Sequence, residues 1–243
     1  MPPKRPAELS RTQPQPAEAP PPSPPAGDAP AAAAGPSPCQ LRLTPDIAVT
    51  HPLPPITGPG ECGADDVVEL DAVVLRDGRR IALAPPATLR CVMAEAVAHW
   101  VRDELVPAAS GLGDKPRSLV VAASYDCRGR NRLLGAKLSE HGRANAIDLR
   151  GLTLADGSAI DFTEPSVAKD FREHIRQSAC THFTTVLGPG SDGYHEKHIH
   201  LDLIERRGGH RICQWEITPA PVPDVASVPM PPERPRAPTN GKQ

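Results

Sequence analysis

Several features that mark common protein classes are missing from this sequence. No apolar run approaches the length of about 18 residues that indicates a membrane-spanning helix. The chain contains neither a Walker-type phosphate loop nor a glycine-rich dinucleotide fingerprint. Its net charge is -2, without the basic stripe that is typical of nucleic-acid binders. We therefore expect no transmembrane segment and no nucleic-acid partner.

Large apolar residues are almost absent from both ends of the chain, where proline dominates instead. Twenty-one of the 32 prolines lie in residues 1–38 and 218–243. Such segments cannot bury enough apolar surface to offset the entropy of the chain. We predict two disordered proline-rich tails, residues 1–36 and 218–243, around a single domain of residues 37–217.

The six cysteines include no Cys-x-x-Cys pair, which argues against a thiolate zinc site or a redox motif. An even number of widely spaced cysteines indicates up to three disulfides and an oxidising compartment. Six reduced thiols in a cytosolic protein are the alternative. The spacing does not choose among the pairings. The six are Cys39, Cys62, Cys91, Cys127, Cys180 and Cys213, all inside the predicted domain.

The hydrophobic pattern predicts an α+β fold with a largely antiparallel sheet and packed helices. Strands and helices do not alternate regularly, which disfavours repeated βαβ units. One helix is predicted over 89–105, bracketed by prolines at 85–86 and 107, and a second over 164–178, with Pro165 in its first turn. Strands are predicted within 67–84 as a hairpin turning at Asp77-Gly78, and at 117–125, 144–150, 152–162, 181–187, 198–204 and 210–217.

Residues 198–203, HIHLDL, alternate strictly between polar and apolar side chains. In a strand, successive side chains point to opposite faces of the sheet. The three apolar residues are therefore expected to face the core, with His198 and His200 together on the other face. Two imidazoles on one face are what a metal site or an acid–base site requires.

Residues 138–151, LSEHGRANAIDLRG, supply further candidate ligands. They contain His141 in a loop and Asp148 at the start of an apolar run that is typical of a strand. Two histidines, one carboxylate and a water form a catalytic zinc sphere that keeps one position open. The alternative is a hydrogen-bonded structural cluster without a metal.

These motifs resemble those of known zinc peptidases. SEHGRANAID follows the Ser-x-His-x6-Asp pattern of the D-Ala-D-Ala peptidases, and HIH resembles their His-x-His pattern. The spacing of His195, His198 and His200 resembles that of the murein endopeptidases. More narrowly, about residues 39–215, with SYDCRGRN and GYHEKHIHLDL, resemble the bacterial extensin-like C-terminal domain family. The resemblance also implies a relation to the superfamily of lysostaphin-type enzymes, D-Ala-D-Ala metallopeptidases and hedgehog domains.

The resemblance implies a single Zn2+ site and a role for each motif residue. His141, Asp148 and His200 would be the metal ligands. His198 would be the base or the transition-state partner, assisted by His195, which could instead orient the substrate. The resemblance further implies that Arg128 stabilises an oxyanion or holds a substrate carboxylate, and that Ser139 binds substrate or supports its loop.

Two positions depart from the related patterns. Ala144 stands where the fuller Ser-x-His-x-x-Gly-x-Ala-x-Asp form has glycine, which is a small change if the position does not need a positive φ. Other branches have a glutamate base three residues before the metal histidine, where this chain has Lys197, with Glu196 one step further back. The identity of the base therefore stays open.

The function implied is a zinc metallopeptidase of the cell wall, acting on peptidoglycan stem peptides as a D,D-carboxypeptidase or an endopeptidase through metal-activated water. A non-catalytic wall-binding domain with a structural zinc is the alternative, and a scaffold acting through its proline tails is a third. The resemblance and the cysteines favour the periplasm or cell envelope, although no apolar stretch of signal-peptide length follows the basic residues near the N-terminus.

Overall fold

The computed structural model describes residues 35–133 and 135–218. The two predicted tails therefore lie outside the described residues, apart from residues 35, 36 and 218. Within the described ranges, no helix is long and apolar enough to cross a membrane.

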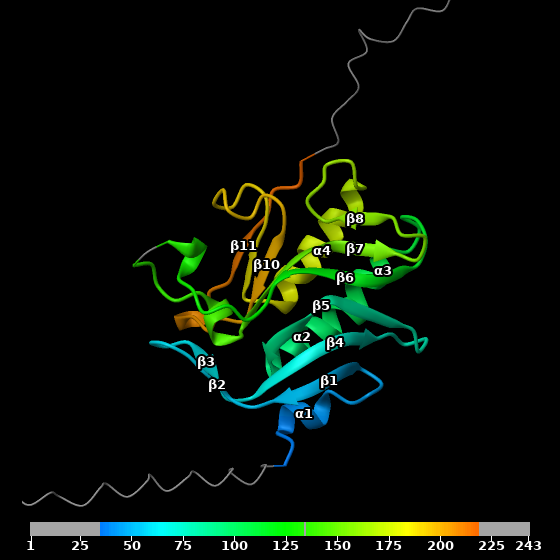
Figure 1. Cartoon of the computed structure of the whole chain (residues 1–243). Coiled ribbons are helices and arrows are strands. Elements are labelled where there is room, and N and C mark those ends of the chain that lie inside the picture. Colours follow the sequence, from blue (N-terminus) through cyan, green and yellow to red (C-terminus); the bar gives the residue numbers. More distant parts are fainter. Residues whose placement is uncertain (1–34, 134, 219–243) are drawn as a thin grey trace, which may run out of the picture. The chain divides into compact units, whose positions relative to one another are not determined.

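A nine-stranded sheet forms the frame of the domain (Figure 1). Its neighbours run in the order β1-β4-β5-β6-β7-β10-β9-β11, with β8 paired to β7. Only the pairs β5–β6 and β9–β11 are parallel among these, so the α+β class and the largely antiparallel sheet are confirmed. The strands are β1 (Ala48–Leu53), β4 (Val67–Val74), β5 (Arg80–Arg90), β6 (Pro116–Ala123), β7 (Ala146–Leu154), β8 (Ala159–Asp161), β9 (Thr185–Leu187), β10 (Ile199–Asp202) and β11 (Ile212–Gln214), while β2 (Ile56–Thr57) and β3 (Gly63–Ala64) pair separately.

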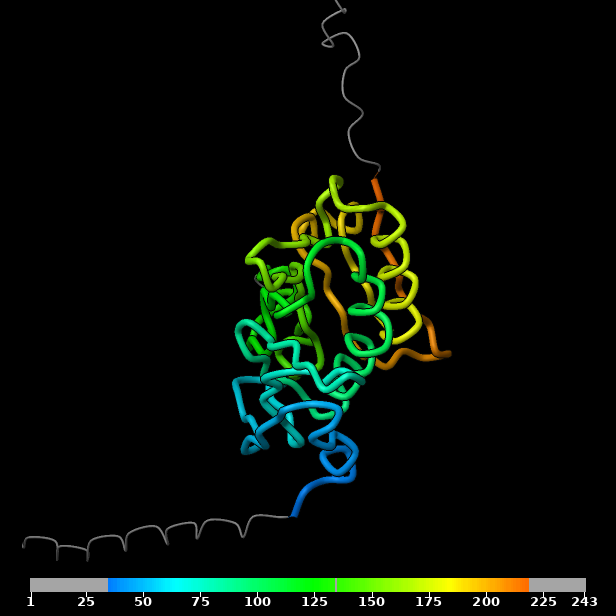
Figure 2. Tube along the Cα trace, turned by 90° about the vertical axis from the view of Figure 1, so that its right-hand side faces the viewer, coloured from blue at the N-terminus to red at the C-terminus, as the bar shows by residue number. Residues whose placement is uncertain are grey.

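Helices α2 (Cys91–Trp100) and α4 (Lys169–His182) lie on the same face of this sheet (Figures 1 and 2). A π-helical turn, Val101–Leu105, continues α2 into the short α3 (Val106–Ala108). The Trp100 indole donates a hydrogen bond of 3.0 Å to Ser178 Oγ and so joins α2 to α4. The two helices therefore form one layer over the apolar side of the sheet.

The strict alternation of the HIHLDL segment has the predicted structural result. Ile199 and Leu201 are fully buried in the core, opposite the equally buried Leu149 and Ile147 of β7. Each such side chain contributes about 1.5–3 kcal/mol by leaving water. The other face of the same two strands carries the polar residues, so one pair of strands supports both the core and the candidate site.

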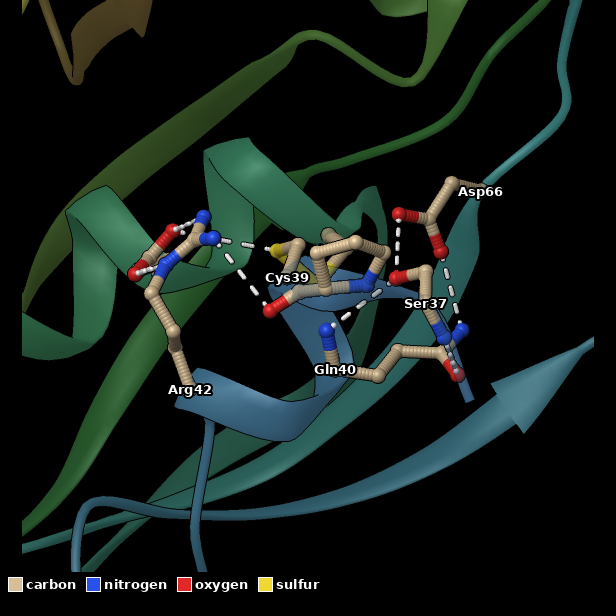
Figure 3. The surroundings of a disulfide bond; sticks show 8 residues. Ser37, Cys39, Gln40, Arg42 and Asp66 are labelled. Carbon is tan, nitrogen blue, oxygen red and sulfur yellow. Dashed lines mark hydrogen bonds and ion pairs between the residues drawn. A yellow bond between two sulfur atoms is a disulfide. The ribbon is translucent and has the colours of Figure 1, made fainter. Parts of the chain in front are cut away.

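Helix α1 (Pro38–Arg42) was not predicted, although its start follows simple capping rules. Ser37 Oγ accepts a bond from the Gln40 amide and donates one of 2.8 Å to Asp66, while Pro38 occupies the first turn. Figure 3 shows this corner, where Gln40 Nε2 also donates to Asp66, at 2.9 Å. The Cys39–Cys91 disulfide then fixes α1 to the start of α2.

Three predicted boundaries were wrong. The prolines at 85–86 lie inside β5 and not before a helix. The β4–β5 register is interrupted opposite them, between Leu70 and Ala72, so no hydrogen bond from a proline nitrogen is needed there. The helix predicted over 164–178 spans Lys169–His182, so Pro165 precedes its first turn. The strands predicted at 144–150 and 152–162 are largely one strand, β7, which turns at Asp156-Gly157 into β8.

All six cysteines are paired, as Cys39–Cys91, Cys62–Cys127 and Cys180–Cys213. Three disulfides are compatible with an extracytoplasmic location. Cys127 directly precedes Arg128, and Cys213 lies in the edge strand β11. Two of the bridges therefore hold segments that border the candidate site.

Candidate metal centre

Strand register brings two of the candidate ligands together. His200 of β10 lies directly opposite Asp148 of β7 in an antiparallel pair, and opposed residues project from the same face of a sheet. His141 comes from a separate 3₁₀ turn, Glu140–Arg143, whose N-cap Ser139 accepts a bond from the His141 amide. A loop and two neighbouring strands thus meet at one point on the polar face.

Three ligand atoms converge there. His141 Nε2 lies 3.1 Å from Asp148 Oδ1 and 3.2 Å from His200 Nδ1, and the latter lies 2.9 Å from the same carboxylate oxygen. Tetrahedral zinc with bonds of about 2.0–2.1 Å places its ligand atoms roughly 3.3 Å apart. The buried cluster, as His141, Asp148 and His200 are called below, therefore has the donor set and the spacing that fit a zinc ion.

The outer nitrogen of each imidazole in the buried cluster has an acceptor of its own. His141 Nδ1 lies 2.6 Å from the Ser124 carbonyl, and His200 Nε2 lies 3.1 Å from Asp202 Oδ2. A proton on each outer nitrogen leaves the inner nitrogens as lone pairs. With the protons so placed, two lone pairs and a carboxylate oxygen face one another, an arrangement that a cation between them would stabilise.

A proton could supply that positive charge in place of a metal. Burial lowers the pKa of His200, but hydrogen bonds to Asp148 and Asp202 outweigh it and raise the pKa to about 9. Burial raises the pKa of Asp148, yet the bonds from His141 and His200 leave it well below its usual range. A metal-free cluster held by a protonated His200 is thus the structural alternative.

The second oxygen of Asp148 faces two of the predicted catalytic residues. Arg128 Nη2 and His198 Nε2 each lie 3.7 Å from Asp148 Oδ2. Arg128 also donates to Asp126 at 3.1 Å, which holds its guanidinium beside the cluster. Burial is the main cause that lowers the pKa of His198, which favours the neutral imidazole.

His195 lies close to both histidines of the HIH motif. Its ring centroid lies 5.1 Å from that of His198 and 5.5 Å from that of His200. Its Nδ1 lies 2.7 Å from Asp192 Oδ1, and Asp192 also accepts bonds from the Tyr194 amide and Asn131. Asp192 therefore orients His195 so that Nε2 faces away from the carboxylate.

Most of the chain is similar to a known protein family. The model of the extensin-like protein C-terminus matches residues 37–214, which is most of the chain. The chain belongs to this extensin-like C-terminal family. No curated protein and no solved structure matches it. The family match begins at Ser37, the N-cap of α1, and ends in β11, so it covers the sheet and all the residues of the candidate centre.

The conformation of Ala144 bears on the departure from the glycine-containing pattern. Its φ is +52°, in the left-handed region that favours glycine. It turns the chain from the His141 turn into β7, and its carbonyl accepts a 2.7 Å bond from Arg90 N. The position does need a positive φ, so alanine here carries a backbone cost that glycine would avoid.

A cavity of about 300 Å³ opens beside the buried cluster. Residues paired across β10, β9 and β11 form its floor, because His200 is opposite Leu187 and Asp202 is opposite Thr185. The parallel pairing of β9 and β11 extends this floor to Ile212 and Gln214. Its remaining walls come from loops and include Arg128, Arg130, Asn131, Ser139, Glu140, Asp192, His195 and Arg206.

Sequence reasoning missed several residues that shape this centre in the extensin-like chain. Asp202 had a signal, because it shares the face of His200 at a spacing of two. The only sequence signal for Asp192 is its separation of three residues from His195. Ser124 has none, because it contributes through its backbone carbonyl. Arg206 lies on a loop after β10 and carries no local signal. Apart from Asp202, these residues are recognised only through tertiary contacts.

Proposed function

We propose that this chain is a zinc-dependent peptidase that cleaves peptidoglycan stem peptides, as a D,D-carboxypeptidase or an endopeptidase. The observation that carries the proposal is the convergence of His141 Nε2, Asp148 Oδ1 and His200 Nδ1 within 2.9–3.2 Å beside a cavity. The bound zinc would act as a Lewis acid that polarises a carbonyl and activates water. The substrate class comes from the resemblance of the motifs to the zinc D-Ala-D-Ala peptidases.

The neighbouring residues have the chemistry that amide hydrolysis needs. His198 lies next to the cluster with a pKa that burial lowers, so as a neutral imidazole it can accept a proton and return it to the leaving amine. His195, held by Asp192 through Nδ1, can do the same through Nε2. Arg128 brings a fixed positive charge that can offset negative charge developing on a substrate oxygen.

A digest of cell-wall peptides tests the proposal directly. The purified full chain, with its zinc content measured, is incubated with a stem pentapeptide and with cross-linked dimers, with and without a chelator. We expect chelator-sensitive loss of a terminal D-Ala or conversion of dimers to monomers, read by mass. A chain that holds one zinc and yields no product would contradict the proposed activity.

The burial of the ligands favours a second candidate function. His141, Asp148 and His200 are only 1%, 5% and 7% exposed, as expected of a metal that stabilises a fold. In that case the chain is a non-catalytic wall-binding domain with a structural zinc. His198→Ala separates the two candidates: a peptidase loses turnover while keeping zinc and fold, whereas a binding domain keeps its affinity for wall peptides.

Both candidates have the same location. Peptidoglycan lies outside the cytoplasm, and the three disulfides are compatible with an oxidising compartment. We therefore propose the periplasm or cell envelope. Fractionation of the producing cell, with the free-thiol content of the protein measured in each fraction, tests this point.

A further inference from the structure

Arg206 lines the cavity, and its guanidinium is held by two bonds. Nη1 donates 3.0 Å to the Thr184 carbonyl, and Nη2 donates 2.6 Å to Thr185 Oγ1. Both acceptors are neutral. Within residues 35–133 and 135–218, no carboxylate lies within ion-pair distance of Arg206, so a fixed positive charge faces the cavity without a counter-ion.

The strand register places Thr185, which anchors this charge, two residues along β9 from the position opposite His200. Thr185, which Arg206 holds, lies opposite Asp202, and the next cross-strand pair on the same face is His200 with Leu187. Two residues along one face of a strand span about 6.5–7 Å. An extended peptide covers that distance with about two residues. A peptide whose amide bond faces the histidines can therefore place a group two residues away beside Arg206.

The floor between the two points suits an extended peptide. Leu187 and Ile212 offer apolar surface, while Gln214 offers an amide that can bond to a peptide backbone. Arg130, an exposed side chain that also lines the cavity, adds a second positive charge at the rim. A carboxylate is the group that best matches a held guanidinium, because it accepts charge-assisted, often bidentate hydrogen bonds.

We propose that Arg206 is a specificity-determining residue that binds a substrate carboxylate about two residues from the bond that faces the buried cluster. This inference rests on the proposed function, because it takes the ligand to be a wall peptide. It adds a requirement that the metal centre alone does not impose: the preferred peptides carry an internal free carboxyl group.

The test compares two probes on the full chain. One is a stem pentapeptide with its internal carboxyl groups free, and the other is the same peptide with those groups converted to amides. Calorimetry on zinc-loaded and on chelator-treated protein measures affinity independently of turnover. We expect the wild type to bind the acid form at least about tenfold more tightly, as a charge-assisted bond provides.

Three variants assign the preference to its residue. Arg206→Gln should bind the acid form no better than the amide form. Arg206→Lys keeps the charge, should retain part of the preference, and guards against loss of fold, which thermal melting checks in each variant. Arg207→Gln removes an exposed neighbouring charge that does not line the cavity and should bind like the wild type.

The outcomes separate this inference from the proposed activity. Equal binding of the two peptides by the wild type, binding of neither, or a preference that survives Arg206→Gln would overturn the role of Arg206. Hydrolysis is followed in the same zinc-loaded samples. A preference without hydrolysis supports Arg206 and contradicts the peptidase, whereas hydrolysis without a preference does the reverse.

Discussion

Two groups of histidine and carboxylate side chains lie on the same sheet, and they differ in almost every other respect. The buried cluster joins β7 and β10 to a loop, whereas the exposed cluster, His51, Glu69 and Asp71, lies on β1 and β4. The ligand atoms of each group lie within 4.8 Å of one another. By residue type and spacing alone, both would qualify as metal sites.

Burial and hydrogen bonding distinguish the two. The His51 side chain is 68% exposed and pairs with Asp71 at 2.6 Å, an arrangement that water and one shared proton satisfy. In the buried cluster, the outer nitrogen of each imidazole has an acceptor of its own, so the two inner nitrogens and the Asp148 carboxylate converge on one point. Proximity of the right residue types is therefore a weak sign of a metal, and buried ligand atoms whose side chains are held in place by further hydrogen bonds are a stronger one.

The largest expected difference is in metal affinity. Removing a direct ligand by His200→Ala should weaken zinc binding about 1,000-fold or more, since even loss of an outer partner costs about 10–100-fold. His51→Ala, the matched change in the exposed cluster, should leave one bound zinc per chain. Metal content after dialysis and competition with a chromophoric chelator measure both. Equal loss in the two variants would remove the distinction drawn here.

Each of these two regions of the domain also has a disulfide near it. Cys39–Cys91 closes a separation of 52 residues at the end of the domain near β1, and Cys62–Cys127 closes one of 65 beside the candidate centre. Replacing either pair by alanine should lower the free energy of unfolding by about 4 kcal/mol through loop entropy. Denaturant unfolding of the two double variants measures this.

Only removal of the Cys62–Cys127 disulfide should affect the buried cluster. Cys127 precedes Arg128, and a side chain at Gly142, next to His141, would lie 3.3 Å from Cys62 Sγ. We therefore expect weaker zinc binding in the Cys62→Ala/Cys127→Ala variant and unchanged binding in the Cys39→Ala/Cys91→Ala variant. Unchanged binding in both would mean that strands β7 and β10 position the ligands without help from this bridge.

The difference between the clusters also explains what the sequence could predict. Period-two alternation located the core residues Ile199 and Leu201 and put His198 and His200 on one face, because this signal is local. The choice of His141, Asp148 and His200 as the ligand set came from the resemblance of their motifs to those of the zinc peptidases. The disulfide pairing and the role of Arg206 depend on which strands become neighbours, which no local pattern records. The start of α4 was misplaced because a proline and a periodic pattern suit the turn before a helix as well as its first turn.

The next effect concerns the outer partner of a ligand. Asp202→Asn keeps the shape of the side chain but removes the charge that holds His200 Nε2 at 3.1 Å. Zinc affinity should fall about 10–100-fold, the usual cost of losing such a partner. Asp71→Asn removes the corresponding carboxylate from His51 and should change neither zinc affinity nor melting temperature measurably. Chelator competition checks the first expectation and thermal unfolding the second, and a zinc affinity unchanged by Asp202→Asn would contradict the assignment of His200 as a ligand.

The smallest expected effect comes from the backbone that presents His141. His51 lies on a regular strand, whereas the His141 turn ends at Ala144 with a φ of +52°. Ala144→Gly should gain about 1 kcal/mol by relieving the left-handed conformation. It should lose about 0.8 kcal/mol of methyl burial and about 0.7 kcal/mol through the greater freedom of glycine in the unfolded chain, so the unfolding free energy should fall by only about 0.5 kcal/mol.

Ala87→Gly is the matched control, because Ala87 is as fully buried but lies in β5 without a positive φ. It should lose about 1.5 kcal/mol, from the buried methyl and from the greater freedom of glycine in the unfolded chain. Denaturant unfolding at equilibrium compares the two. Equal losses would mean that the positive φ at Ala144 costs nothing, and that glycine is usual at this position for a reason other than backbone conformation.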